Sequence, residues 1–274
     1  VADYFAHRWS DPTYLAGLAL VEAHCPAPST AFELACGIGH HLRALAGRGA
    51  AVTGVDVVFA KLWVARHWVV PGATLICLDA AGEWPLPTGG FELVACHDAF
   101  YFLEPKAAIL ARLRSLLSTD GVLAIGHVHN REATNFSAGS GMCAAELSPM
   151  FPDGLFYDDD ELTRALAEGR APVASAPTAL SGVEAFAIAA GPALRPAQAV
   201  LGGLALPPAG AVLSRNPLYD DAGRLAWPSP RYHREYGPRA TYPPQTAAPL
   251  TAIHDAAHRA QARRRELVHL PERW

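Results

Sequence analysis

The stretch that most constrains the fold is Phe32-Glu33-Leu34-Ala35-Cys36-Gly37-Ile38-Gly39, in which a short apolar run stops at two glycines. A helical pattern begins directly after it, so the stretch predicts a strand, a tight turn and a helix start. Glycine lets the backbone approach a ligand closely, and free amide groups at a helix start favour polar or anionic groups. We therefore expect this turn to hold a nucleotide-like ligand.

Strand-like and helix-like segments alternate around this turn. A helix is expected after Asp11-Pro12. The predicted strands cover residues 31–35, 52–55, 74–78, 91–96, 122–128 and 183–189, and the predicted helices cover 41–46, 60–68, 105–117 and 158–166. Alternation at this spacing indicates right-handed βαβ units and a parallel sheet with helices on both faces. Residues 130–150 lack periodicity and are predicted to form a long loop at the edge of the sheet.

The segment 192–274 differs in composition, because prolines and aromatic residues are interleaved through it. This pattern is typical of an extended arm rather than a second packed domain. A terminal helix is expected over residues 250–270, with Arg263, Arg264 and Arg265 on it. We predict one domain over residues 1–191 and a Pro-rich C-terminal arm over 192–274, which serves as a lid, a dimer contact or part of a substrate pocket.

Three acidic residues stand at the ends of the first three predicted strands, namely Glu33, Asp56 and Asp79. Since parallel strands open onto the same edge of a sheet, these carboxylates should converge on one crevice. Asp56 has the spacing from the glycines at which a carboxylate reaches the ribose hydroxyls of an adenosine cofactor. Asp79 can accept from an adenine amine or form only a local turn, and Glu33 can hold an ammonium group.

The ordered motifs of residues 30–130 resemble those of the class I S-adenosylmethionine (SAM)-dependent methyltransferases. These motifs are E-L-A-C-G-I-G, V-T-G-V-D, C-L-D-A, F-E-L-V-A-C-H-D-A and S-T-D-G-V-L-A-I. The resemblance implies an α/β fold with a doubly wound, seven-stranded, mostly parallel sheet, the Rossmann-like methyltransferase fold. It also implies SAM as cofactor and S-adenosylhomocysteine as product.

The same resemblance implies a role for each cofactor-binding position. It places Glu33, Gly37 and Gly39 around the methionine part, Asp56 and Val57 at the ribose and adenine, Asp79 and Ala80 at the adenine edge, and His97 on the floor near the sulfonium.

Two positions within and after the glycine turn depart from known patterns. Ala35, in the cofactor-binding stretch, stands where the family usually has glycine. Leu42 stands where a G-x-G-x-x-G dinucleotide fingerprint requires Gly or Ala. Leu42 therefore argues against NAD, the cofactor of an alternative oxidoreductase function.

Histidines after the fourth and fifth predicted strands are the catalytic candidates. Methyl transfer from a sulfonium is an in-line displacement that depends mainly on positioning. A hydroxyl acceptor would also benefit from a general base with a pKa near neutrality, for which His97 and His129 are the candidates. Asp98, Tyr101 and His127 are expected to line the acceptor pocket.

The net charge of the chain and the absence of two motifs favour a small-molecule acceptor that is methylated on O, N or C. The formal net charge of −4 and the pI near 6.3 give no basic field for nucleic acid. After the fourth predicted strand the sequence has neither the Asn/Asp-Pro-Pro-Tyr/Phe run of adenine- and glutamine-methylating enzymes nor the Pro-Cys pair of cytosine-C5 enzymes, which argues against these acceptors. The alternative is a non-catalytic SAM-fold binding or scaffold protein that contacts a partner through the arm.

Location, assembly and metal binding are predicted from simpler features. The five cysteines lack C-x-x-C spacing and lie mostly in apolar runs, as in reduced core positions. With no apolar leader and no membrane-length apolar run, we expect a cytoplasmic protein without membrane contact, and a homodimer through the arm. No metal site is predicted, because His254 and His258 have ligand spacing but lack the H-E-x-x-H glutamate and a third ligand.

Overall fold

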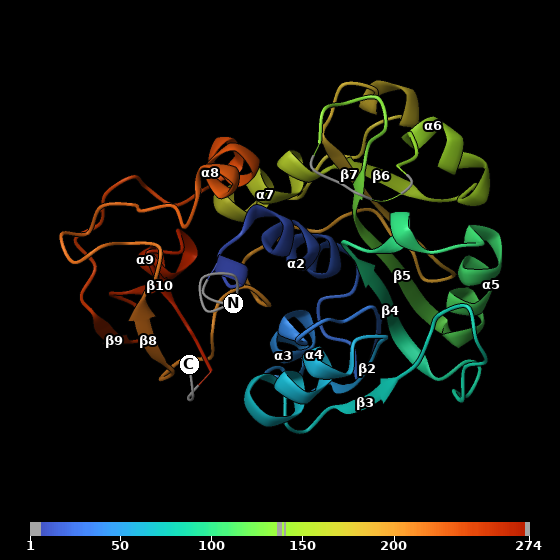
Figure 1. Ribbon diagram of the computed structural model, residues 1–274, viewed down its shortest axis with the longest axis horizontal. Helices are drawn as coiled ribbons and strands as arrows, with labels where there is room; N and C mark the ends of the chain where they lie inside the picture. The colour runs from blue at the N-terminus through green and yellow to red at the C-terminus, as the bar shows by residue number, and fades with distance from the viewer. Residues whose placement is uncertain (1–6, 136–138, 140, 272–274) are drawn as a thin grey trace.

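The computed structural model describes residues 7–135, 139 and 141–271, which contain a seven-stranded sheet and a separate three-stranded sheet (Figure 1). The strands of the large sheet are β1 (Thr30–Leu34), β2 (Ala51–Asp56), β3 (Thr74–Cys77), β4 (Phe91–His97), β5 (Leu117–His129), β6 (Leu155–Asp158) and β7 (Ala185–Ala190). Their order is β3-β2-β1-β4-β5-β7-β6. The first five strands are parallel, and β7 runs antiparallel to both β5 and β6.

Helices cover both faces of this sheet, as the predicted doubly wound fold requires (Figure 1). The helices are α2 (Pro12–His24), α3 (His40–Ala46), α4 (Phe59–Val64) with a π-helical continuation (Ala65–Val69), α5 (Lys106–Leu116), α6 (Ala144–Leu147) and α7 (Asp159–Glu168). One apolar core contains side chains of α2, α3, α4 and α7, and the other contains those of α5 and α6. The alternating side chains of the strands supply both cores.

Local sequence signals set the ends of two helices that frame the site. Asp11 caps α2, because its carboxylate accepts from the amide of Tyr14 at 2.6 Å, and Pro12 occupies the first turn. Asp158 caps α7 in the same way, and Gly169 ends it with a φ of 71°.

The predicted α/β fold is confirmed, and the strands expected within residues 31–128 are present with ends shifted by a few positions. β5 starts earlier than expected, since Leu117 already pairs with Phe91 directly after α5. Sequence reasoning missed β6, whose four residues are too few to show a period. The loop expected over residues 130–150 is interrupted by a bridge between Asn130 and Met142 and by α6, while residues 136–138 and 140 lie outside the described residues.

The C-terminal segment is more ordered than the extended arm that we predicted. Strands β8 (Val212–Arg215), β9 (Thr251–Ile253) and β10 (Leu267–Val268) form the antiparallel sheet β10-β8-β9, and α8 (Pro230–Tyr236) and α9 (Arg259–Arg263) accompany it. This sheet has its own core, formed by Leu206, Leu213, Ala248, Ala262 and Leu267. It packs because apolar residues from distant parts of the segment meet, while most of the prolines lie in the connections.

The expected terminal helix over residues 250–270 is wrong. β-branched residues at Thr251 and Ile253 pair with β8 instead, and Leu267–Val268 pairs with the other edge of β8. Only the five residues of α9 between them are helical, and Arg265 follows with a φ of 59°, which a helix cannot contain.

Two other sequence expectations can be compared with the described residues. All five cysteines are free, with Cys36, Cys96 and Cys143 buried, Cys25 half-buried and Cys77 exposed. Among the described helices, none has the length and apolar character needed to cross a membrane.

Candidate functional site

The glycine turn between β1 and α3 has a left-handed backbone at three positions. The φ angles are 57° at Ala35, 58° at Gly37 and 78° at Gly39. A Cβ at Gly39 would lie 2.9 Å from Val70 Cγ1, so both the backbone and the packing require glycine there. Ala35 adopts the same strained conformation with a side chain.

A cavity of about 480 Å³ opens at the carboxyl ends of β1, β2 and β4, next to this turn. Of the positions predicted to bind the cofactor or acceptor, its walls include Glu33, Ala35, Gly37, Asp56, Val57, Asp79, Ala80, His97 and Asp98. Gly39 lies behind the wall, and Tyr101, His127 and His129 do not line this cavity. The carboxylates of the first three strands therefore meet as the parallel topology requires.

Asp56, the last residue of β2, is held against the glycine turn. Its Oδ2 accepts from the amide of Gly37 at 2.9 Å, and its Oδ1 accepts from the amide of Val58 at 2.8 Å. A carboxylate has further lone pairs beyond these two bonds. The two amides thus fix the orientation of a buried carboxylate at the cavity wall.

Asp79 forms the local turn that the sequence suggested as an alternative to an adenine contact. Its Oδ1 accepts from the amide of Ala81 at 2.9 Å, which is an Asx turn. The residue also lines the cavity together with Ala80, so the turn presents the carboxylate to the site.

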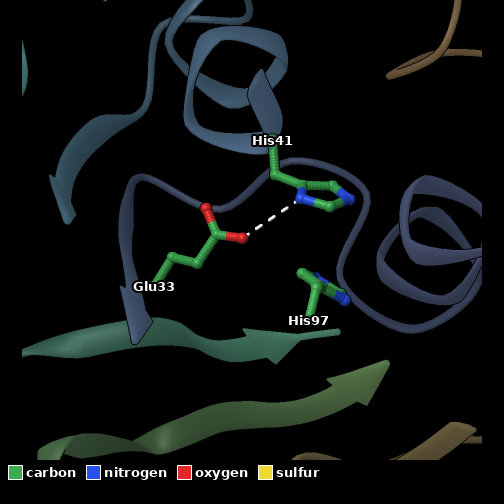
Figure 2. A group of neighbouring side chains, drawn as sticks. All are labelled: Glu33, His41 and His97. Atoms are coloured by element: carbon green, nitrogen blue, oxygen red, sulfur yellow. Dashed lines mark ion pairs between the residues drawn. The ribbon is translucent and has the colours of Figure 1, made fainter. Parts of the chain in front are cut away.

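Glu33, His41 and His97 form a buried cluster at the inner end of the cavity (Figure 2). Glu33 alternates onto the α2 and α3 face of β1, where His41 Nδ1 lies 3.1 Å from Glu33 Oε1. The His41 ring stacks on that of His97 with centroids 4.2 Å apart. Glu33 Oε2 and His97 Nδ1 lack hydrogen-bond partners within the described part of the chain, so this cluster has unused polar atoms for a ligand.

Burial sets the protonation of this cluster. Loss of solvent raises the pKa of the Glu33 carboxyl to about 7, with the His97 charge opposing and the Asp56 charge adding to the rise. Loss of solvent also lowers the pKa of His41 and of His97 to about 3 each. Both imidazoles are therefore neutral at physiological pH, and Glu33 is close to its titration midpoint.

The acceptor-side candidates lie at the ends of β4 and β5. Asp98 accepts from the Tyr101 hydroxyl at 2.7 Å through Oδ1 and from Arg8 at 3.2 Å through Oδ2. His127 and His129 are buried behind Asp98, with their ring centroids 4.6 Å apart. Tyr101 and His127, which we expect in the acceptor pocket, do not line this cavity: Tyr101 donates to Asp98, and His127 lies beside Asp98 with its Nδ1 on Asp159.

Part of the chain matches a known protein family. Residues 31–121 match a family model described as a methyltransferase domain. This segment is a class I SAM-dependent methyltransferase domain. SAM is the cofactor of this family.

This segment is similar to proteins from two bacteria. One is a trans-aconitate 2-methyltransferase from Paracidovorax citrulli, 33% identical over 108 residues that make up 39% of this chain and 41% of that protein. Another is the putative methyltransferase YqeM from Bacillus subtilis, 27% identical over 146 residues, or 52% and 53% of the two chains. The chain thus spans about half or less of the length of these relatives.

A solved structure is similar over a larger part of the chain. It is a TehB-like SAM-dependent methyltransferase from Corynebacterium glutamicum, 20% identical, with a TM-score of 0.46 over 64% of this chain and 85% of that one.

The methyltransferase domain also has cavity-lining residues that sequence reasoning missed, among them Arg8, His41 and Lys61. His41 carried a usable signal, because it stands in the first turn of the helix after the glycines and its side chain can turn back toward β1. Arg8 had no such signal, since only the three-dimensional fold brings it to Asp98 from 90 residues away.

Proposed function

We propose that this protein transfers a methyl group from SAM to an O, N or C atom of a small-molecule acceptor. The observation that carries the proposal is the cavity at the ends of β1, β2 and β4, where Asp56 is locked against the Gly37 amide. Its volume of about 480 Å³ is in the range of small-molecule and cofactor sites.

The predicted cofactor contacts fit this cavity with SAM bound in one orientation. The amino acid part of SAM lies at Glu33, the ribose at Asp56 and Val57, and the adenine between Asp79 and Ala80. Glu33 suits the ammonium group because a buried carboxylate gains from a cationic partner. The space beside the Gly37 backbone is open, because no protein atom lies within 4 Å of where its Cβ would stand. The cofactor can therefore approach this backbone closely.

His97 is the better placed of the two proposed general bases. It lines the cavity, whereas His129 does not. Because burial lowers its pKa to about 3, His97 is a weak base, and we infer that positioning contributes more to the rate than proton removal.

A small-molecule acceptor is supported by the cavity volume of about 480 Å³ and by the name of one relative, trans-aconitate 2-methyltransferase. We propose that residues 1–191 bind the cofactor and that residues 192–274, the C-terminal unit, serve as a lid, a dimer contact or part of the substrate pocket. A cytoplasmic location and a homodimer through this unit belong to the same proposal, and light scattering tests the dimer.

Titration calorimetry with SAM and S-adenosylhomocysteine tests the cofactor site. Wild-type protein should bind both, and Asp56→Ala should weaken binding about ten- to hundredfold, since a hydrogen bond to a charged group contributes about 1.5–3 kcal/mol. Asp220→Ala is the matched control, because it removes a partly exposed carboxylate of the C-terminal unit. This variant should bind both ligands like wild type.

The outcomes separate the proposed enzyme from its alternatives. Absent binding of both ligands, together with wild-type behaviour of Asp56→Ala, would refute the SAM site. Binding without S-adenosylhomocysteine release over a panel of hydroxyl, amine and carboxylate acceptors would favour the non-catalytic binding or scaffold protein. Binding of NADH in a fluorescence titration would favour the oxidoreductase.

A further inference from the structure

A second group of polar side chains meets beside the cofactor cavity, at the ends of β4 and β5. Asp98 directly follows β4, and His127 and His129 are among the last three residues of β5. One potential ligand atom from each residue lies within 4.8 Å of those of the other two. Asp98 lines the cavity and both histidines are buried, so the group has one open side.

Both histidines have a carboxylate next to Nδ1. His127 Nδ1 donates to Asp159 Oδ2 at 2.5 Å, and His129 Nδ1 lies 3.0 Å from Glu184 Oε1. Metal-binding histidines commonly place one ring nitrogen against a carboxylate, which fixes the tautomer and leaves the other nitrogen for the ion. Nε2 is accordingly the available ligand atom of both rings.

An irregular backbone brings the two rings to one point. The pairing of β5 with β7 shifts in register between Ile125 and Val128, and the φ of His127 is 52°. The planes of His127 and His129 lie at 77° to one another. In-plane lone pairs from rings at this angle can converge on a single ion, as tetrahedral coordination requires.

The charges around the group favour a cation. The carboxylates of Asp98, Asp159 and Glu184 face the two imidazoles. Two guanidinium groups lie beside them, and each is shared with a further carboxylate: Arg8 is 3.2 Å from Asp98 and 3.1 Å from Asp11, and Arg239 is 3.2 Å from Glu184 and 3.9 Å from Asp160. Three negative groups thus meet two positive ones. Asp98 keeps lone pairs for an ion besides its bonds to Arg8 and to the Tyr101 hydroxyl.

The cluster of Glu33, His41 and His97 also has three ligand atoms within 4.8 Å, but its geometry is less suitable. Its two rings are stacked at an angle of 29°, so their in-plane lone pairs run nearly parallel (Figure 2). Its unused polar atoms belong to the proposed cofactor site described above.

We propose that Asp98, His127 and His129 bind one divalent transition-metal ion, such as Zn²⁺. Two histidines and one carboxylate are a ligand set that leaves a coordination position open. That position would face the cavity, where an oxygen of the acceptor is a suitable fourth ligand. This last step rests on the proposed methyl transfer, whereas metal binding itself does not.

Metal binding is tested on untagged full-length protein that has been treated with a chelator and dialysed. Calorimetric titration with Zn²⁺ should show one ion per chain, and Co²⁺ should give visible absorption bands of a protein-bound ion. His129→Ala and Asp98→Asn should each weaken Zn²⁺ binding at least about tenfold. Asp98→Asn is the conservative variant, because its amide keeps the shape of the Asp98 side chain.

Two other histidine variants act as controls, and circular dichroism confirms that each variant is folded. His258→Ala removes a histidine of the C-terminal unit, and His41→Ala removes one of the stacked rings. Both should leave Zn²⁺ affinity unchanged. No stoichiometric binding by wild type would overturn the proposal, as would binding that His41→Ala or His258→Ala abolishes while His129→Ala does not. S-adenosylhomocysteine titration of the metal-free protein reports separately on the methyltransferase proposal.

Discussion

At the scale of single residues, Ala35 shows how a cofactor turn can depart from its family pattern and still form. Its φ of 57° is the conformation that glycine adopts without cost, and the family usually has glycine at this position. The methyl group also lines the cofactor cavity. Ala35 therefore combines backbone strain with a small intrusion into the site.

We predict that Ala35→Gly stabilises the protein slightly and tightens cofactor binding. Relief of the left-handed conformation is worth about 1–2 kcal/mol, and the greater freedom of glycine in the unfolded chain costs about 0.4–1 kcal/mol. Urea denaturation should give an unfolding free energy equal to or up to about 1.6 kcal/mol above wild type.

The matched control for that substitution is Ala51→Gly, at an exposed first position of β2 without positive φ. It should lose about 0.5–1 kcal/mol, as expected for glycine in a strand. If Ala35→Gly were destabilised as much as Ala51→Gly, the strain at position 35 would be disproved.

At the scale of elements, the strand ends explain which parts of the site could be predicted. Glu33, Asp56 and Asp79 were predictable because each stands at the end of a parallel strand, and topology alone brings such positions together. The strand ends also placed Asp98, His127 and His129 on the acceptor side, but the close approach of their ligand atoms was not predictable, since it depends on positive φ angles and a register shift. Local patterns do not reveal either feature.

The same reasoning applies to whole strands and helices. The five parallel strands show apolar runs between helical patterns, so each is visible within its own few residues. β8, β9 and β10 are two to four residues long, and their paired residues are 37 to 54 positions apart in the sequence, from Ser214–Thr251 to Ser214–Val268. Their pairing depends on long-range packing, and the prolines between them pointed to an extended arm instead.

The Glu33 carboxyl gives cofactor binding a predicted pH dependence. With a pKa of about 7, Glu33 carries a proton in acid, and an ammonium group that binds beside it must displace that proton. Affinity for S-adenosylhomocysteine should therefore rise from pH 5.5 toward 7, by up to about tenfold per pH unit, and level off above it. His41 and His97 stay neutral throughout, because their pKa values of about 3 lie below this range.

Calorimetry at several pH values, in buffers of different ionisation enthalpy, measures both the affinity and the protons released. Glu33→Gln is the control, because its amide does not titrate, and its affinity should be weaker and independent of pH. A pH-independent wild-type affinity would show that Glu33 does not contact the ammonium group.

At the scale of the whole molecule, the C-terminal unit is joined to the large sheet mainly through α2, α3 and the segment after β7. Figure 1 shows the small sheet on the far side of α2 from the large sheet. Arg43 on α3 donates to the carbonyl of His269 at 2.8 Å, and Arg239 lies 3.2 Å from Glu184 just before β7. The unit is thus held by polar contacts to backbone and charged groups as well as by packing.

Glu22 on α2 makes two further polar contacts with this unit. Its two carboxylate oxygens accept from the amides of Gly203 and Leu204 at 2.8 and 2.9 Å, and the side chain is buried. Removal of the carboxylate leaves the buried amide of Leu204 without a partner, at a cost of about 1–3 kcal/mol, whereas water can reach the amide of the exposed Gly203. We predict that Glu22→Ala lowers the unfolding free energy by roughly 1–3 kcal/mol.

The form of the unfolding curve then tells whether residues 192–274 fold with the large sheet. If the two parts are one cooperative unit, Glu22→Ala shifts a single transition seen by both circular dichroism and tryptophan fluorescence. If they are separate, an early transition appears that releases only the C-terminal unit, and limited proteolysis cuts after β7 first. Glu83→Ala, at an exposed position, should change neither curve by more than about 0.5 kcal/mol. A Glu22→Ala curve that matches Glu83→Ala would contradict the anchoring role of Glu22.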